Sequence, residues 1–406
     1  MISFLKNDFY LSSSKMKLSI TLILLTCIII IIQCYALKNE SNESNASNQC
    51  QALDSTQVNP IDLQSYVSSC ENLPKAIYNA LDNHKIIEGD EDNWKYYLPC
   101  AYTFCETNIL KFENIEDSKN LYILDGCDSI ASKVTIWSLI KNKFGSRAHE
   151  IMPETFILSD QLDFERFRKF YEKRKIENKN NKFILKNFKQ RQIGLKLVNS
   201  LDEISKGVED NFKVVQDYLE NPYTVSGHKI NLRYYILITC FKGQINGYIF
   251  DDGFLYYTPE KFEKYSMDPA KNITTGYIDR KIYDENPLTI KQFRKRIGSK
   301  KSLILEKQVK EKFNKIMSAL SEKICSNKKL RNHYKFQLFG SDIAPDENLN
   351  VTLMEMNKGP DLGYKSDEDG ELKRSLVNEM FQIAKSHDRF IKDESNQFKS
   401  RFIKIY

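Results

Sequence analysis

Near the carboxyl end of the chain, two stretches of alternating apolar and polar positions flank a cluster of turn-forming residues. The segment FQLFGSDIAPDENLNVTLMEMNKGP covers residues 336–360, with the turn at PDEN, and this arrangement predicts an antiparallel β-hairpin. Side chains alternate across a strand, so Glu355 and Asn357 point to the same face. Reflection of the chain about the turn places Asp342 opposite Glu355. The pattern therefore predicts that two carboxylates and one amide converge.

Two interpretations fit these three polar side chains. Carboxylate and amide oxygens suit Mg²⁺, a hard cation that keeps several waters and commonly shares its ligands with phosphates. The alternative is the solvated face of a half-exposed hairpin, because alternating polar positions are typical of an antiparallel sheet with one wet side. The spacing by itself favours the solvated face, so the metal site needs support from elsewhere in the chain.

Helical periodicity and strand alternation divide the rest of the chain into further elements. Apolar residues recur at helical intervals in SIASKVTIWSLIKNKF, which predicts one helix over residues 129–144. The runs HKINLRYYILITCFKG and QINGYIFDDGFLYYT predict two long strands joined by a turn. Shorter strands are expected at residues 182–186 and 195–199. Further helices are predicted over residues 73–84, 302–326 and 371–387.

Basic residues mark two of these segments. Lys229, Asn231 and Arg233 share one face of the first long strand, which indicates either a cationic site for an anion or an ordinary solvated face. The loop NFKQRQIG lies between the two shorter strands, where it is a plausible lid over phosphates. It contains only one glycine, Gly194, whereas backbone cradles for phosphate favour more. Neither segment identifies a phosphate site on its own.

The amino terminus carries a long apolar run. From Met16 the chain reads MKLSITLILLTCIIIIIQCYA, with a lysine, an apolar stretch and small residues where a signal peptidase would cleave. We expect a secretory signal over residues 1–36. The alternative is a membrane anchor over Leu18–Leu37, because about 20 apolar residues can cross a bilayer.

The residues after the apolar run are polar and low in complexity. LKNESNESNASNQC contains three acceptor patterns for N-glycosylation, at Asn39, Asn42 and Asn45, and two more occur at Asn272 and Asn350. We therefore expect a polar, glycosylated linker over residues 37–60, although chance is a rival explanation in a chain rich in Asn and Ser.

Composition and cysteine positions bear on the type of partner and on the presence of disulfides. The 60 Lys and Arg exceed the 54 Asp and Glu by a small, dispersed margin, so a nucleic acid partner is not implied. Seven of the nine cysteines follow the apolar run, and an oxidising compartment would allow disulfides among those of the amino-terminal part, Cys50, Cys70, Cys100 and Cys105. Cys240 lies in the apolar run YYILITC, where we expect a buried thiol.

The motifs FILK, VVQDYLENP, GHKINLRYYILIT and FQLFGSDIAPDENLNVTLMEMN resemble, in order and approximate spacing, those of the tubulin tyrosine ligase-like family. The resemblance extends from about Lys133 to Gly363. It implies an α+β, ATP-grasp-like fold with mainly antiparallel sheets and flanking helices, preceded here by the signal peptide or anchor. It divides the chain after the linker into an amino-terminal α/β region, a central subdomain, a carboxyl-terminal subdomain and a basic tail, at residues 61–150, 151–220, 221–390 and 391–406.

The resemblance also implies the roles of individual residues, with ATP and Mg²⁺ as cofactors. Lys133 and Lys186 stand where the family places lysines that touch the nucleotide phosphates. Gln216 and Leu219 match the segment that edges the adenine. Lys229 and Arg233 match the family's basic residues near the phosphates and the amino-acid substrate. Asp342, Glu355 and Asn357 match its magnesium-binding residues.

The implied reaction is the ligation of tyrosine, glutamate or glycine to a protein carboxylate. Four positions depart from the family pattern: Asn231 replaces an acid, Asp251 and Tyr256 each replace an arginine, and Thr275 replaces an asparagine. The loop NFKQRQIG also lacks most of the family's glycines. These departures motivate an alternative, a catalytically inactive nucleotide-binding or protein-binding member of the same fold.

The partners follow from the reaction and the compartment. They are a free amino acid and a protein acceptor, which is tubulin or a protein of the secretory pathway. We expect the chain in the endoplasmic reticulum lumen or outside the cell, and a membrane is involved only if the apolar segment is not cleaved. The alternative is an anchored protein that faces the cytosol.

Overall fold

The structure is a computed structural model that describes residues 64–100, 106–177, 181–187, 194–390 and 400–406. These residues belong to one compact unit, Asp62–Tyr406. The expected signal peptide or anchor and the linker lie outside the described residues. No described helix is long and apolar enough to pass through a bilayer.

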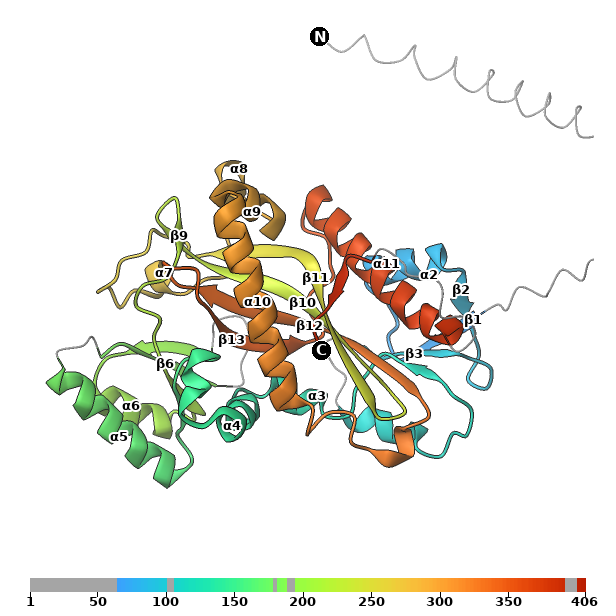
Figure 1. Cartoon of the computed structure of the whole chain (residues 1–406), viewed down its shortest axis with the longest axis horizontal. Helices are drawn as coiled ribbons and strands as arrows, with labels where there is room; N and C mark the ends of the chain where they lie inside the picture. The colour runs from blue at the N-terminus through green and yellow to red at the C-terminus, as the bar shows by residue number, and fades with distance from the viewer. Residues whose placement is uncertain (1–63, 101–105, 178–180, 188–193, 391–399) are drawn as a thin grey trace, which may run out of the picture. The chain divides into compact units, whose positions relative to one another are not determined.

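A ten-stranded sheet forms the centre of this unit (Figure 1). Its strands are β1 (Gln64–Ser68), β2 (Ile86–Glu88), β3 (Tyr96–Leu98), β4 (Asn120–Leu121), β9 (Thr224–Val225), β10 (His228–Phe241), β11 (Gln244–Tyr257), β12 (Tyr334–Pro345), β13 (Val351–Lys358) and β14 (Phe402–Lys404). The main path runs β14-β11-β10-β12-β4-β3-β1-β2, and β13 and β9 pair with β12 and β10. Pairing is antiparallel among the carboxyl-terminal strands, as expected, but parallel among β1 to β4 and between β4 and β12.

The second half of strand β10 is apolar because both of its faces are covered. Ile236 belongs to the same buried cluster as Phe313 of helix α10 (Ser299–Leu320). Leu237 points to the opposite face, where the buried cluster includes residues of helix α11 (Asp367–Phe390). In Figure 1, α10 and α11 lie on different sides of the central strands. A strand buried on both faces is expected to be a continuous apolar run, and this explains YYILITC.

A second sheet of four strands stands beside the first. It contains β5 (Thr155–Ile157), β6 (Phe183–Lys186), β7 (Leu195–Val198) and β8 (Val214–Asp217), in the order β5-β8-β6-β7 and antiparallel throughout. The two shorter predicted strands are thus confirmed as β6 and β7. Helices α5 (Gln161–Ile176) and α6 (Leu201–Glu209) share a buried cluster with this sheet.

The predicted helix over residues 129–144 is interrupted at Ser132. Its two parts are α3 (Cys127–Ala131) and α4 (Lys133–Phe144). Ser132 has extended backbone angles, and its hydroxyl accepts a hydrogen bond from the amide of Thr135, so it caps α4. Lys133 is therefore the first residue of a helix rather than a residue within one.

Helix α2 (Lys75–Asn83) confirms the helix predicted over residues 73–84. The remaining helical segments have eight residues or fewer and are η1 (Glu106–Phe112), η2 (Gly145–Glu150), α7 (Pro269–Asn272), α8 (Ile282–Glu285), α9 (Ile290–Ile297) and η3 (Lys328–Leu330). The helices α10 and α11 confirm the two predicted over residues 302–326 and 371–387.

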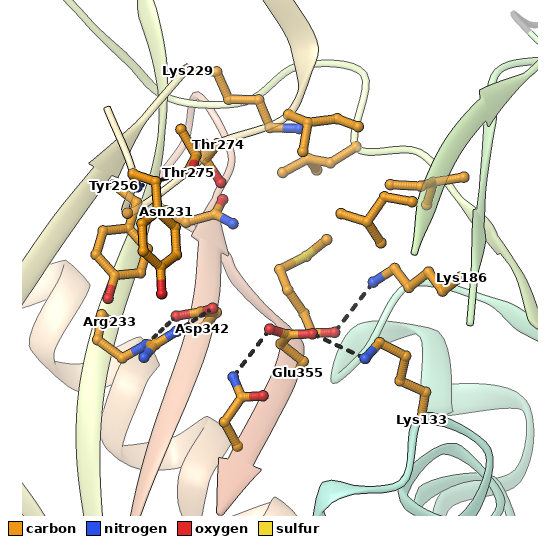
Figure 2. A pocket seen from close by; sticks show the side chains of 18 of the residues that line it. Lys133, Lys186, Lys229, Asn231, Arg233, Tyr256, Thr274, Thr275, Asp342 and Glu355 are labelled. Carbon is orange, nitrogen blue, oxygen red and sulfur yellow. Dashed lines mark hydrogen bonds and ion pairs between the residues drawn. The ribbon is translucent and has the colours of Figure 1, made fainter. Parts of the chain in front are cut away.

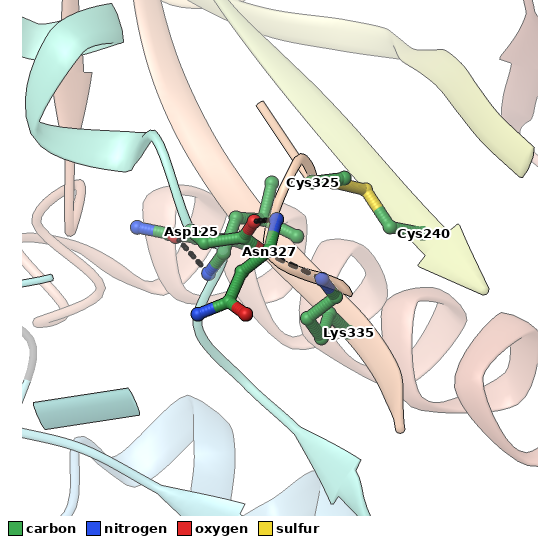
Figure 3. Close-up of a disulfide and its surroundings, with 7 residues drawn as sticks. Asp125, Cys240, Cys325, Asn327 and Lys335 are labelled. Carbon is green, nitrogen blue, oxygen red and sulfur yellow. Dashed lines mark hydrogen bonds and ion pairs between the residues drawn. A yellow bond between two sulfur atoms is a disulfide. The ribbon is translucent and has the colours of Figure 1, made fainter. Parts of the chain in front are cut away.

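The expectation of a buried thiol at Cys240 is wrong. Cys240, near the end of β10, is joined to Cys325, which follows α10, in a disulfide with a Cα–Cα distance of 6.2 Å (Figure 3). Asp125 fixes the partner segment, because its backbone carbonyl accepts from the amide of Cys325 at 2.9 Å and its carboxylate accepts from the amide of Asn327 at 2.8 Å. The cross-link was missed because it joins segments 85 residues apart.

A second disulfide joins Cys70 and Cys100 with a Cα–Cα distance of 4.9 Å. It falls within the amino-terminal part, where disulfides were expected. Cys127 is a free, buried cysteine, and Cys50 and Cys105 lie outside the described residues.

Candidate active site

A cavity of about 240 Å³ lies between the two sheets (Figure 2). Residues of β6, β7 and β8 line it on the side of the small sheet, and residues of β10, β11, β12 and β13 line it on the side of the large sheet. The predicted residues that line it are Lys133, Lys186, Leu219, Lys229, Arg233, Asp342, Glu355 and Asn357. The structure thus brings together eight side chains that are spread over more than 200 residues of sequence.

The predicted hairpin carries the acidic part of the site. Asp342 of β12 pairs with Glu355 of β13, and Gly340 pairs with Asn357, so the hairpin register is confirmed. The amide nitrogen of Asn357 donates to Glu355 Oε1 at 3.0 Å. The three side chains meet at the cavity wall, as the alternation of the strands requires, and their role in binding a metal stays a prediction.

Arg233 forms a two-pronged ion pair with Asp342. The two residues are opposite each other in the β10–β12 ladder, and Arg233 Nε and Nη2 donate to Asp342 Oδ1 and Oδ2 at 2.5 and 2.8 Å. Burial alone would lower the pKa of Arg233, but the Asp342 carboxylate outweighs this effect and holds the pKa well above its ordinary value. Arg233 is therefore a permanent cation held in a fixed orientation.

Glu355 is surrounded by positive charge. Lys133 Nζ lies 3.4 Å from Glu355 Oε2. Burial would raise the pKa of Glu355, but Lys133, the hydrogen bond from Asn357, and Lys186 lower it to about 2. The carboxylate is ionised at any physiological pH and can act only as an acceptor or a metal ligand.

Two lysines of the cavity wall donate to neutral oxygens, and neither has a carboxylate as a hydrogen-bond partner within the described residues. Lys186, the last residue of β6, donates to the carbonyl of Met354 at 3.3 Å, and burial lowers its pKa to about 8. Lys229 of β10 donates to the hydroxyl of Tyr218 at 3.0 Å and to the carbonyl of Asn272 at 3.2 Å. Burial, followed by the charges of Lys182 and Lys186, lowers the pKa of Lys229 to about 7. Both lysines would regain full charge beside an anion.

The two predicted adenine residues are placed differently. Leu219 lines the cavity, whereas Gln216 is not among the described residues that do so. The side chain of Gln216 is fully buried, and its amide donates to Thr155 Oγ1 at 2.8 Å within the small sheet. Gln216 is paired with Ile184 of β6, which lines the cavity, so it lies on the face of the small sheet that is turned to the cavity. Its Oε1 is buried and has no hydrogen-bond partner among the described residues.

Three of the four positions that depart from the expected pattern meet at one end of the cavity, and Asp251 is not among its lining residues. Asn231 and Tyr256 face each other across β10 and β11, and both line the cavity together with Thr275. The ring of Tyr256 lies 4.9 Å from the guanidinium of Arg233. Asn231 Oδ1 is buried and has no hydrogen-bond partner among the described residues. This end of the cavity therefore carries neutral polar side chains at three of the positions singled out from the sequence.

Sequence reasoning missed two residues that shape the cavity, Tyr218 and Asn272. Both line it and both contact Lys229. Tyr218 is in the motif VVQDYLENP, between the two residues singled out there, so its position in the motif was the available signal. Asn272 carries no comparable signal, because it comes from a short helix in a long irregular segment.

Comparison with known proteins gives a family. Residues 116–396 match the model of the tubulin-tyrosine ligase family. A protein of Caenorhabditis elegans named probable tubulin polyglutamylase ttll-9 is 30% identical over 201 residues, which cover 47% of this chain and 47% of the relative. Human tubulin monoglutamylase TTLL4 is 25% identical over 297 residues, covering 67% of this chain and 24% of the relative. Mouse probable tubulin polyglutamylase TTLL2 is 25% identical over 313 residues, covering 72% and 55%. The chain spans less than two thirds of the length of each of these relatives.

Proposed function

Because the chain belongs to the tubulin-tyrosine ligase family, we propose that it joins an amino acid to a carboxylate of a protein acceptor, in a reaction that depends on ATP and Mg²⁺. The observation that carries the proposal is the convergence of two carboxylates, one amide and four cations in a single cavity. The four cations that carry the proposal are Lys133, Lys186, Lys229 and Arg233, and Lys358 and Lys365 also line the cavity.

The acidic group fits a magnesium ion. Glu355 is ionised, and Asp342 keeps acceptor capacity beyond its pair with Arg233, since a carboxylate has about four lone-pair sites. Asn357 adds an amide oxygen, and such an oxygen donor set is the kind that Mg²⁺ prefers. These three residues would hold the ion, which when bound would neutralise charge on the phosphates.

The cations fit a triphosphate. ATP would activate a carboxylate by phosphoryl transfer, and an amine would then displace the phosphate to form the amide. Negative charge builds up on phosphate oxygens in both steps, and preorganised cations stabilise it without reorganisation. One such donor is typically worth about 3 kcal/mol, or roughly a hundredfold in rate. Lys186 and Lys229 suit this role because their ammonium groups have only neutral hydrogen-bond partners.

Glutamate is the first amino acid to test, because the relatives reported above are named as glutamylating enzymes. Their acceptor, tubulin, is the first protein acceptor to test for the same reason. The identity of both substrates is part of the proposal.

The direct experiment measures ATP consumption that requires both an amino acid and a protein acceptor. Glu355→Gln should reduce the rate about a hundredfold, because a neutral amide binds Mg²⁺ poorly. Glu322→Gln is a matched control, since Glu322 is exposed and pairs only with Lys143 on the surface. Equal rates for wild type and Glu355→Gln, or no turnover with any pair of substrates, would contradict the proposal.

A catalytically silent nucleotide-binding protein is the second candidate. The guanidinium of Arg233 lies 4.9 Å from the centre of the Tyr256 ring, and the side-chain oxygen of Asn231 has no hydrogen-bond partner in the described part of the chain. Calorimetry with ATP and Mg²⁺ separates the two candidates. Binding without turnover of any substrate pair favours the silent protein, and turnover excludes it.

The disulfides indicate the cellular compartment in which the chain would encounter its protein acceptor. Four of the five cysteines in the described part of the chain are paired, and disulfides persist in oxidising compartments and are rare in the cytosol. We therefore propose an acceptor in the secretory pathway or outside the cell. A cytosolic acceptor such as tubulin is the alternative.

A further inference from the structure

Tyr218 lies at the centre of a buried group of cations beside the cavity. Its ring centroid is 4.2 Å from Lys229 Nζ and 4.4 Å from Lys182 Nζ. Its hydroxyl accepts a hydrogen bond from Lys229 at 3.0 Å and lies 3.0 Å from both the carbonyl and the side-chain oxygen of Asn272. Tyr218 thus contacts the ammonium groups of Lys182 and Lys229, and it also contacts Asn272, which accepts hydrogen bonds from both lysines.

The two lysines differ in how fully they are bound. Lys182 Nζ donates to the carbonyls of Lys264 and Ser266 and to Asn272 Oδ1, at 3.2, 2.6 and 2.6 Å, so all three of its donors are used. Lys229 has two acceptors, Tyr218 and Asn272, and it lines the cavity. One N–H of Lys229 is therefore left for a ligand, whereas Lys182 is a structural residue.

We infer that Tyr218 is a positioning residue, whose hydroxyl holds the ammonium group of Lys229 at the cavity wall. In this position the Lys229 side chain takes up a proton when an anionic ligand enters the cavity. The inference deepens the proposed function and rests on it for the identity of the ligand, a polyphosphate. It rests on the geometry of Tyr218, Lys229 and Asn272 for its mechanism.

The groups that face Lys229 explain the proton uptake. Lys182 and Lys186 of the small sheet are both cationic and disfavour a third charge. Asp217 of β8 is a carboxylate nearby in sequence to Tyr218, but it is engaged by Arg174 at 2.7 and 2.8 Å. The remaining contacts of Lys229 are neutral, from Tyr218, Asn272 and Thr258.

The sign of the effect follows from these contacts. With its pKa lowered to about 7, Lys229 is half protonated near pH 7 in the free protein. An anion beside it favours the charged form and raises the pKa. Binding at pH 7 should therefore take up roughly half a proton per site.

Isothermal titration calorimetry in buffers with different ionisation enthalpies measures this uptake directly. The titrants are a non-hydrolysable ATP analogue and, separately, tripolyphosphate. Wild type should take up protons with both titrants. Lys229→Met should bind both more weakly and take up far fewer protons, with only the smaller contribution of Lys186 remaining. Tyr218→Phe removes only the hydroxyl, so it should weaken binding three- to tenfold and change the amount of proton uptake.

Tyr265→Phe is the matched control, because Tyr265 is 77% exposed and does not line the cavity. Thermal unfolding of each variant shows whether it is folded. If Tyr218→Phe binds with unchanged affinity and unchanged proton uptake, the inference is overturned, and the same holds if wild type binds neither titrant or takes up no protons. Binding of tripolyphosphate with proton uptake, but not of the ATP analogue, would overturn the proposed function and leave the inference standing.

Discussion

At the scale of single residues, the site depends on the shape of its side chains as much as on their charge. Arg233 contacts both oxygens of Asp342 and stacks beneath Tyr256. A guanidinium matches a carboxylate with two parallel hydrogen bonds, which an ammonium cannot do. The orientation of Asp342 toward Glu355 therefore depends on an arginine at this position.

Arg233→Lys should lower kcat/KM for the proposed ligation about tenfold to a hundredfold, since it loses one charge-assisted hydrogen bond and the stacking. The measurement is the initial rate of ATP-dependent ligation, with nucleotide affinity measured in parallel. Arg147→Lys is the control, because Arg147 makes the same two-pronged contact with Glu150 on the surface. A change in Arg233→Lys no larger than in this control would show that the fork is dispensable.

Lys229 also links the site to stability. A lysine titrates near 10.4 in an unfolded chain, whereas the folded protein lowers the pKa of Lys229 to about 7. The unfolded state therefore binds more protons between these values, so stability should rise with pH over that window.

Lys229→Met should reduce this rise, and it should raise stability at pH 7 by about 1–3 kcal/mol because it removes a buried charge. Urea unfolding of both proteins at pH 7 and pH 9 is the measurement. Parallel pH dependences for wild type and variant would mean that Lys229 keeps an ordinary pKa in the folded protein.

At the scale of elements, helix ends decide where cations are placed. Ser132 ends α3 and caps α4, which makes Lys133 the first residue of α4 and lets it reach Glu355. An uninterrupted helix, as periodicity predicted, would place Lys133 inside a helical turn. The short interruption therefore matters more for the site than the helix itself.

Ser132→Ala should lower the free energy of unfolding by about 1 kcal/mol, because α4 loses its N-terminal cap. It should also weaken nucleotide binding, because the cap fixes the position of Lys133 at the start of that helix. Asp160→Ala provides the comparison. Asp160 caps α5, which contributes no residue to the cavity, through bonds from the amides of Leu162 and Asp163. That variant should lose similar stability and keep its affinity. Equal effects of the two variants on affinity would refute the link between the cap and the site.

At the scale of the whole molecule, two disulfides cross-link distant parts of the described chain. Cys240–Cys325 ties a strand of the cavity to the end of α10, and Cys70–Cys100 closes the amino-terminal part. Loops of 85 and 30 residues are closed, and each such cross-link is typically worth about 2–4 kcal/mol.

Peptide mapping of material from its natural source, alkylated before reduction, should find both pairs oxidised and Cys127 alkylated. It should also find a glycan at Asn350, which is exposed in the turn before β13, and none at Asn272, which is buried. Free thiols at both cysteine pairs would place the chain in a reducing compartment and restore tubulin as the leading acceptor.

The sequence by itself determined the hairpin that carries Asp342, Glu355 and Asn357, because a strand period of two and a local turn fix that geometry within about 20 residues. It also determined the two long strands β10 and β11, because runs of strand-forming residues separated by a glycine-containing turn predict a pair of adjacent strands.

Only the tertiary structure decided which groups surround that hairpin. The Tyr218 contact with Lys229, the hydrogen bond from Gln216 to Thr155 and the Cys240–Cys325 bond all join separate elements of the chain. Such contacts depend on how separate elements pack, and neither periodicity nor residue type encodes the distance between two elements that meet only after folding.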